Sequence, residues 1–279
     1  MALKDILVHV DGALGTGFAF ANALARRHDA HVAALHAYDA VGPAAMAAAG
    51  DANPAAVERF IRETQEAERE TSATLRAQCE GAWRRDGIAG EWRVVEGTPD
   101  LVVQRHARFA DLAVFSRGPV EGSRTDGVAL AQAALFGTGR PVVVAPPRWD
   151  AGTAPGRVLV AWSGTRESAR AIHDALDLLA AAERVRLLTV AAVEGLEEAR
   201  LDADFMARHL ARHGVNATAE VTAGGEARPD ELILNSLADG ADDLLVIGGY
   251  GHSRLREMML GGVTREMLRH APVPVLLAH

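Results

Sequence analysis

Cysteine and lysine are almost absent from this chain of 279 residues, which contains one of each, Cys79 and Lys4. A single cysteine can form neither an intramolecular disulfide nor a cysteine-based zinc site. Cys79 is therefore expected to act as a small hydrophobic residue. A phosphate-binding Walker A lysine is excluded as well. Any phosphate must be held by arginine side chains or by backbone N–H groups.

Long uncharged apolar runs are also missing. No run of about 18 apolar residues lacks a charge or a break, so we expect no membrane span. The first residues, MALKDILVHVDG, show no secretory signal pattern. Because the formal net charge is -8, neither nucleic acid nor an anionic membrane is expected as the main partner. These features together favour a cytoplasmic protein.

What the chain does contain is an ordinary globular composition and an internal repeat. Hydrophobic residues make up 49% and charged residues 24%, and the length suits two domains. Three short segments recur in the same order: DLAVF at 111–115 and DLLVI at 243–247, TPD at 98–100 and RPD at 228–230, RPVVV at 140–144 and VPVLL at 273–277. The repeat predicts domains at residues 1–147 and 156–279, joined by a linker at 148–155.

Strands alternate with helices in both halves of the sequence. The first half predicts strands at 6–10, 31–38, 92–95, 111–115 and 141–145, and helices at 18–27, 54–80, 99–109 and 128–136. The second half predicts strands at 157–162, 185–190, 244–247 and 273–277, and helices at 168–179, 196–213 and 263–270. The alternation indicates an α/β fold with two open, mostly parallel sheets. The terminal strands of both halves are apolar edges that need covering, so we expect the domains to pack as a pseudo-dimer.

A glycine-rich loop between residues 248 and 262 is the strongest candidate site. It contains Gly248, Gly251, Gly261 and Gly262, directly before a predicted helix. Glycines leave backbone N–H groups unshielded, and a helix N-terminus favours an anion. Parallel sheets bind ligands at the carboxyl ends of their strands, where this loop lies. The alternative interpretation is a strand-to-helix connection that uses glycine only for tight packing.

With these elements placed, the chain resembles the universal stress protein family, in a form with two family domains in tandem. The family's nucleotide motif is G-x2-G-x9-G followed by Ser or Thr. Gly248, Gly251 and Gly261 match it, whereas Gly262 stands where the hydroxyl residue belongs. The resemblance implies an adenine nucleotide alpha hydrolase-like fold, with ATP or another adenine nucleotide as ligand, with or without Mg. The further residues that it implies for this site are Ser163, Val190, Ile247, His252, Ser253, Val263 and Thr264.

Both domains depart from the family pattern. Ser163 stands where ATP-binding members carry an acidic residue at the end of the first strand. Losing a carboxylate and a hydroxyl is predicted to weaken nucleotide binding by roughly 2 to 4 kcal/mol, about 30-fold to 1000-fold. The first domain keeps Asp11 at that position, but Ser116, Pro119 and Ala129 replace the three glycines. We therefore expect a degenerate site there, with Asp11 acting as a turn-forming residue more than as a ligand.

No catalytic constellation is visible in the sequence, and no metal site is expected. His209 and His213 have a spacing that can hold a metal, but no acidic or cysteine partner is placed beside them. The sequence thus predicts a non-enzymatic stress-response protein that binds an adenine nucleotide weakly in its second domain and forms a homodimer. A nucleotide-free interaction module acting through oligomerisation and a slow ATPase are the alternatives.

Overall fold

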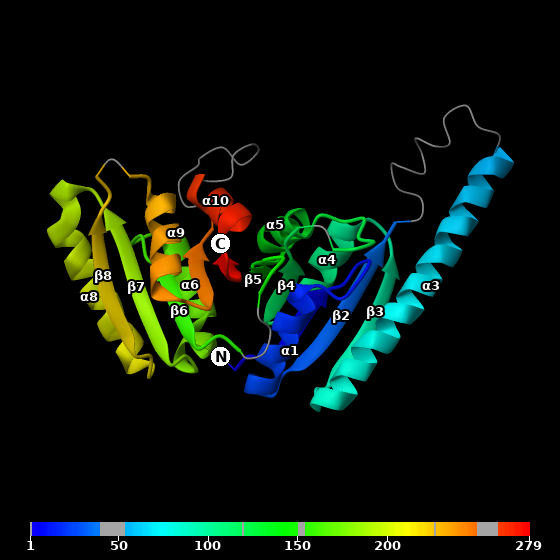
Figure 1. The fold of residues 1–279 in the computed structure, drawn as a ribbon, viewed down its shortest axis with the longest axis horizontal. Helices are drawn as coiled ribbons and strands as arrows, with labels where there is room; N and C mark the ends of the chain where they lie inside the picture. Colours follow the sequence, from blue (N-terminus) through cyan, green and yellow to red (C-terminus); the bar gives the residue numbers. More distant parts are fainter. Residues whose placement is uncertain (1, 40–53, 119, 150–153, 226, 250–261) are drawn as a thin grey trace.

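The computed structural model describes residues 2–39, 54–118, 120–149, 154–225, 227–249 and 262–279. The first half of the chain alternates strands and helices as predicted (Figure 1). Its strands are β1 (Asp5–His9), β2 (His31–Tyr38), β3 (Gly90–Glu96), β4 (Leu112–Ser116) and β5 (Val142–Ala145). Its helices are α1 (Thr16–His28), α3 (Pro54–Asp86), α4 (Pro99–Ala107) and α5 (Gly127–Thr138).

The helix α3 is longer than its predicted span of 54–80. Its last two turns carry Ala82 and Trp83, which are both buried in the core. The indole Nε1 of Trp83 donates a hydrogen bond of 3.1 Å to Asn22 Oδ1 of α1. The helix therefore continues to the point where Gly87 adopts a positive φ of 67°.

The second half of the chain follows the same plan. Its strands are β6 (Arg157–Ala161), β7 (Arg184–Ala191), β8 (Ala217–Ala223), β9 (Leu244–Gly248) and β10 (Val275–Ala278). Its helices are α6 (Arg166–Asp174), α7 (Leu176–Ala180), α8 (Leu196–Arg212), α9 (Pro229–Gly240) and α10 (Gly262–His270), with a 3-10 turn, η1 (Val193–Gly195), before α8.

Three details of the second half differ from the sequence prediction. One is the helix α9, for which no span is predicted although the repeated segment RPD at 228–230 stands at its start. The helix expected at 168–179 is divided into α6 and α7 at Ala175, where the backbone leaves helical geometry with φ −91° and ψ 0°. The strand β8 was not predicted, because its residues are mostly half-buried and their small side chains give no clear alternation. In the structure, β8 is recognised by its parallel pairing with β7 at seven positions.

All strands of the described residues join one ten-stranded sheet with the order β3-β2-β1-β4-β5-β10-β9-β6-β7-β8. Neighbouring strands are parallel, as in β1–β4 and β6–β9. The exception is the central pair, β5 and β10, which is antiparallel. The two expected sheets are therefore continuous, and the apolar terminal strands cover each other, as predicted.

Helices cover both faces of the sheet (Figure 1). One core cluster joins buried side chains of α1, α3, α6, α7 and α8 to the sheet. The other joins α4, α5, α9 and α10 to the opposite face. This doubly wound arrangement brings the ends of β1, β4, β6 and β9 to the carboxyl edge of the sheet, where such folds bind ligands. None of the described helices has the length and apolar character of a membrane span.

The aspartate that precedes the fourth strand of each half, Asp111 or Asp243, accepts hydrogen bonds from the backbone near the start of the first strand. Asp111 Oδ2 accepts hydrogen bonds of 2.9 and 3.0 Å from the backbone N–H groups of residues 4–5. Asp243 Oδ2 accepts bonds of 3.2 and 3.0 Å from residues 156–157. Burial by itself would raise the pKa of the Asp243 carboxyl, but these bonds and the Arg157 guanidinium lower it.

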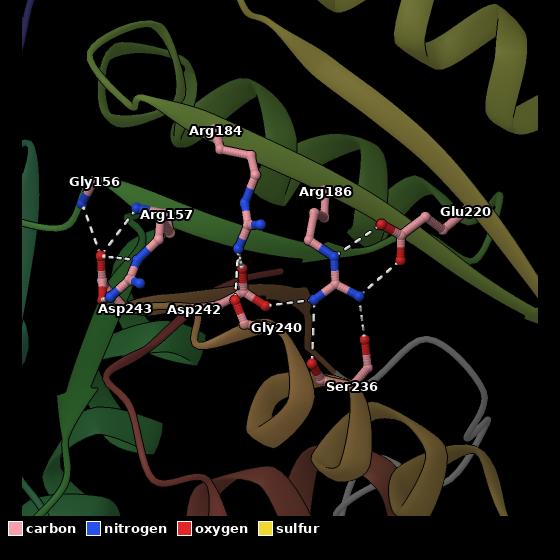
Figure 2. Close-up of polar contacts among 9 residues, drawn as sticks. All are labelled: Gly156, Arg157, Arg184, Arg186, Glu220, Ser236, Gly240, Asp242 and Asp243. Atoms are coloured by element: carbon pink, nitrogen blue, oxygen red, sulfur yellow. Dashed lines mark hydrogen bonds and ion pairs between the residues drawn. The ribbon is translucent and has the colours of Figure 1, made fainter.

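An ion-pair network braces the second half at the amino ends of its strands (Figure 2). Arg186 of β7 lies 2.7 Å from Glu220 of β8 and 2.7 Å from Asp242, which precedes β9. Its Nη2 also donates to Ser236 Oγ of α9 at 2.8 Å. The Asp242 side chain is fully buried, and Arg184 lies 3.4 Å from it. The network ties three strands and one helix together on the edge opposite to the carboxyl edge.

Candidate functional site

A cavity of about 240 Å³ opens at the carboxyl edge of the second half, beside the ends of β6 and β9. We call it the β6/β9 cavity. Its volume is close to the lower end of the range typical of small-molecule sites, about 300 to 1,000 Å³. The described residues that line it are Ala161, Trp162, Ser163, Thr165, Leu188, Val190, Pro229, Ile233, Ile247, Gly248, Gly262, Val263 and Thr264.

The inner wall of the β6/β9 cavity is apolar. Leu188 and Val190 lie two residues apart on β7, so their side chains point to the same face of the sheet. Ile247 of β9 and Ile233 of α9 complete this wall and are 7% and 5% exposed. Because the wall offers no hydrogen-bonding side chains, it suits a flat apolar surface of a ligand.

The mouth of the cavity is polar but uncharged. Ser163 is exposed, and its Oγ lies 3.1 Å from Thr165 Oγ1. Thr165 caps α6 through a reciprocal pair of hydrogen bonds with Ser168, which fixes the loop after β6. On the other side stands Thr264 of α10, with 4% of its surface exposed. No lining residue among those described is titratable at neutral pH.

Seven of the residues predicted for the nucleotide site come together at this cavity: Ser163, Val190, Ile247, Gly248, Gly262, Val263 and Thr264. Gly251, His252, Ser253 and Gly261 lie outside the described residues. The structure therefore brings together the base-side and helix-side residues that the resemblance implied.

Gly248 and Gly262 have opposite surroundings. A Cβ atom at Gly248 would lie 2.5 Å from the backbone N of Ser168 and 2.6 Å from the carbonyl carbon of Glu167. At Gly262 nothing lies within 4 Å of such an atom. For Gly248, tight packing against the start of α6 thus accounts for the glycine, as the alternative interpretation held. A larger side chain would fit at position 262 without a clash, so packing does not explain the glycine there.

Six lining residues were not singled out from the sequence: Ala161, Trp162, Thr165, Leu188, Pro229 and Ile233. Leu188 could have been found, since it precedes Val190 by two positions on one strand. Pro229 could have been found from its place at the start of a repeated helix. The contribution of Ile233 depends on how α9 lies over the sheet, which residue spacing does not give.

The corresponding space in the first half is filled by larger side chains. His9 and Phe115 directly follow the paired residues Val8 and Val114 of β1 and β4, just as Ala161 and Ile247 follow the paired residues Val160 and Val246 of β6 and β9. The His9 and Phe115 rings are stacked, with centroids 6.3 Å apart. They are 8% and 0% exposed, so these two rings occupy the core at this point.

Asp11 holds a loop of its own chain. Its Oδ2 accepts hydrogen bonds from Ser123 Oγ at 2.9 Å, from the backbone N–H of Arg124 at 2.9 Å and from Thr125 Oγ1 at 2.8 Å. Burial would raise the pKa of Asp11, but these bonds outweigh burial and lower it. Ser116 Oγ likewise accepts from the Gly17 N–H at 3.0 Å. Both residues of the degenerate site therefore have internal partners.

The paired histidines of α8 lie close together, with His209 and His213 ring centroids 4.8 Å apart. Among the described residues, no group of three or more His, Cys, Asp or Glu side chains could hold a metal ion.

Comparison with known proteins gives matches to one family. A sequence model of the universal stress protein family matches residues 155–279. A universal stress protein from Synechocystis sp. is 28% identical over 138 residues, which cover 49% of this chain and 46% of that protein. The match thus spans about half the length of the relative.

Solved structures agree in fold. A universal stress protein from Archaeoglobus fulgidus covers 100% of this chain and 99% of its own, with a TM-score of 0.73 at 16% identity. A universal stress protein family protein from Arabidopsis thaliana, solved with AMP bound, covers 44% of this chain and 91% of its own, at 22% identity and a TM-score of 0.33. The family model thus matches the second half of the chain, residues 155–279, and the Archaeoglobus fulgidus structure agrees with the doubly wound fold of the whole chain.

Proposed function

We propose that this protein binds an adenine nucleotide weakly in the β6/β9 cavity and acts as a non-enzymatic stress-response protein of the cytoplasm. The observation that supports the proposal is the position of the cavity at the carboxyl edge, lined by seven of the residues that the family resemblance predicts for the site. The match of the family model to this half agrees with it.

The chemistry of the lining fits a nucleotide. The apolar wall of Leu188, Val190, Ile233 and Ile247 can take a planar base. The helix α10 begins at Gly262 beside the cavity, and the unpaired N–H groups of a helix start favour phosphate. Since no carboxylate lines the described part of the cavity, a Mg²⁺ ion would depend on the phosphates of the nucleotide for its ligands.

The same lining supports a binding role over hydrolysis. A general acid or base needs a titratable side chain within hydrogen-bond reach of the reacting atom. The described lining offers only hydroxyl groups, the indole of Trp162 and apolar side chains. We therefore propose that the protein senses or stores the nucleotide and does not hydrolyse it.

Calorimetry with ATP, ADP and AMP on the full chain tests this function. We expect weak binding to the wild type and about tenfold tighter binding to Ser163→Asp, because a charged acceptor forms a stronger hydrogen bond than a hydroxyl. Thr74→Asp on the exposed face of α3 adds the same charge far from the cavity and serves as control. Absence of heat and of a Tm shift at millimolar nucleotide, in both wild type and Ser163→Asp, would refute the proposal.

A nucleotide-free interaction module, working as a homodimer, is the second candidate. The first half favours it, because the His9 and Phe115 rings lie in the core at the equivalent position and the Asp11 carboxylate is bound by its own loop. Mass spectrometry of the purified protein decides between the two, since recovered nucleotide counts against this candidate. Light scattering measures the proposed dimer independently.

A further inference from the structure

A second cavity lies where the two halves of the sheet meet, between α5 and α10. Its volume is about 570 Å³. Arg117, Asp126 and Gln132 line it from the first half, and Arg265, Leu268 and Arg269 line it from the second. We call it the arginine cavity. It is separate from the β6/β9 cavity, because residues 262–264 of α10 line that one and residues 265, 268 and 269 line this one.

The arginine cavity carries excess positive charge in a chain whose net charge is -8. Its one carboxylate, Asp126, caps α5 by accepting from the backbone N–H groups of Val128 at 2.9 Å and Ala129 at 3.4 Å. Within the described residues, no carboxylate forms an ion pair with Arg117, Arg265 or Arg269, although most arginines of the second half have such partners.

Two of these arginines are partly buried. The Arg117 Nη1 donates to the backbone oxygen of Leu268 at 3.2 Å, across the junction of the halves. Burial lowers the pKa of its guanidinium. The Nε of Arg265 is buried and has no hydrogen-bond partner in the described part of the chain. Buried charge and unsatisfied donors are costly, and an anion in the cavity would compensate both.

We propose that the arginine cavity binds a small polyanion of the di- or triphosphate type, held between the two halves by Arg117, Arg265 and Arg269. Guanidinium groups suit this ligand because their planar fork donates paired hydrogen bonds to phosphate oxygens. A bound polyanion would link the first half to α10, whose first residues, 262–264, border the β6/β9 cavity.

The test is calorimetry of the full chain with pyrophosphate, tripolyphosphate and citrate. Phosphate ligands are expected to bind, and binding of citrate alone would assign the cavity to carboxylates and overturn the phosphate assignment. Arg117→Gln and Arg265→Gln are each expected to weaken phosphate binding at least about tenfold. Arg212→Gln on exposed α8 removes one charge elsewhere and should leave binding unchanged.

A substitution that should increase the affinity for phosphate gives a sharper test. Gln132 precedes Pro141 by the same interval as Arg265 precedes Pro274, so the two side chains hold equivalent positions in the repeat. Gln132→Arg should strengthen tripolyphosphate binding several-fold, since it adds a guanidinium to the same cavity. Adenosine, which lacks phosphate, should bind all these variants as it binds the wild type, which separates this test from that of the β6/β9 cavity.

Two results would overturn the inference. One is a wild type that gives no heat with millimolar tripolyphosphate at low salt. The other is tripolyphosphate affinity that stays equal in wild type, Arg117→Gln and Arg265→Gln. Thermal melts of each variant establish that a loss of binding does not come from unfolding.

Discussion

At the scale of single residues, Gly248 is a packing position inside the candidate site. Gly248→Ala is expected to lower the free energy of unfolding by about 1 to 3 kcal/mol, because its Cβ would meet the backbone of residues 167–168 at 2.5 to 2.6 Å. Gly262→Ala is the matched control, since its Cβ enters open space. Urea denaturation measures both. Equal stability of the two variants would contradict the assignment of Gly248 to packing.

The buried residue His9 should make the stability of the protein depend on pH. Burial lowers its pKa to about 4 from the ordinary 6.5, while the nearby Asp11 raises it and His36 lowers it further. Between those two pH values the unfolded chain takes up a proton that folded His9 does not. The free energy of unfolding therefore falls as the pH drops from 6.5 towards 4, by up to about 3 kcal/mol.

The variant His9→Leu isolates this effect. It removes the titrating group and a buried Nε2 that lacks a hydrogen-bond partner among the described residues. We expect the pH dependence of stability to flatten between pH 6.5 and 4, measured by urea denaturation at several pH values. His213→Leu, at an exposed position on the end of α8, should keep the wild-type slope. An unchanged slope in His9→Leu would rule out the buried histidine as its source.

At the scale of elements, the network around Arg186 holds β7, β8 and α9 to the start of β9. Asp242→Ala is expected to destabilise the protein by about 3 kcal/mol, because it removes a fully buried carboxylate that pairs with both Arg184 and Arg186 and leaves Arg186, with 14% of its side chain exposed, only Glu220 as a charged partner. Glu197→Ala breaks the exposed Arg200–Glu197 pair of α8 and should cost less than about 0.5 kcal/mol. Thermal unfolding of both variants provides the comparison, and a similar small loss in each would show that the network is not stabilising.

At the scale of the whole molecule, the antiparallel pair of β5 and β10 makes one sheet from two repeats. Val143 and Leu276 are opposite each other in this pair, and both are fully buried. We therefore expect the halves to unfold together. Variants that keep only Trp83 in the first half or only Trp162 in the second should show the same urea midpoint by fluorescence.

The substitution Leu276→Asp tests the same coupling from the seam. A buried carboxylate there should lower both midpoints together, because the residue packs against both halves of the sheet. Two separate transitions, with only the Trp162 midpoint lowered, would show that the halves are independent.

The sequence by itself determined the α/β alternation, most elements of the sheet and the likeness of the second half to the universal stress protein family. It did so because repeated segments such as DLAVF and DLLVI mark equivalent strands, and because apolar periodicity follows backbone geometry. It missed α9 and also β8, whose small residues leave little periodicity. It ended α3 too early because the burial of Trp83 is a long-range contact.

The tertiary structure decided what each site residue touches. Gly248 and Gly262 are the same residue type, but only Gly248 packs against the backbone of another segment. Asp11 has the residue type of a ligand, but its carboxylate is taken up by a loop more than 100 positions away. The arginine cavity exists only because strand pairing brings Arg117 and Arg265 together across the junction. Contacts of this range depend on packing between elements, which local residue patterns do not encode.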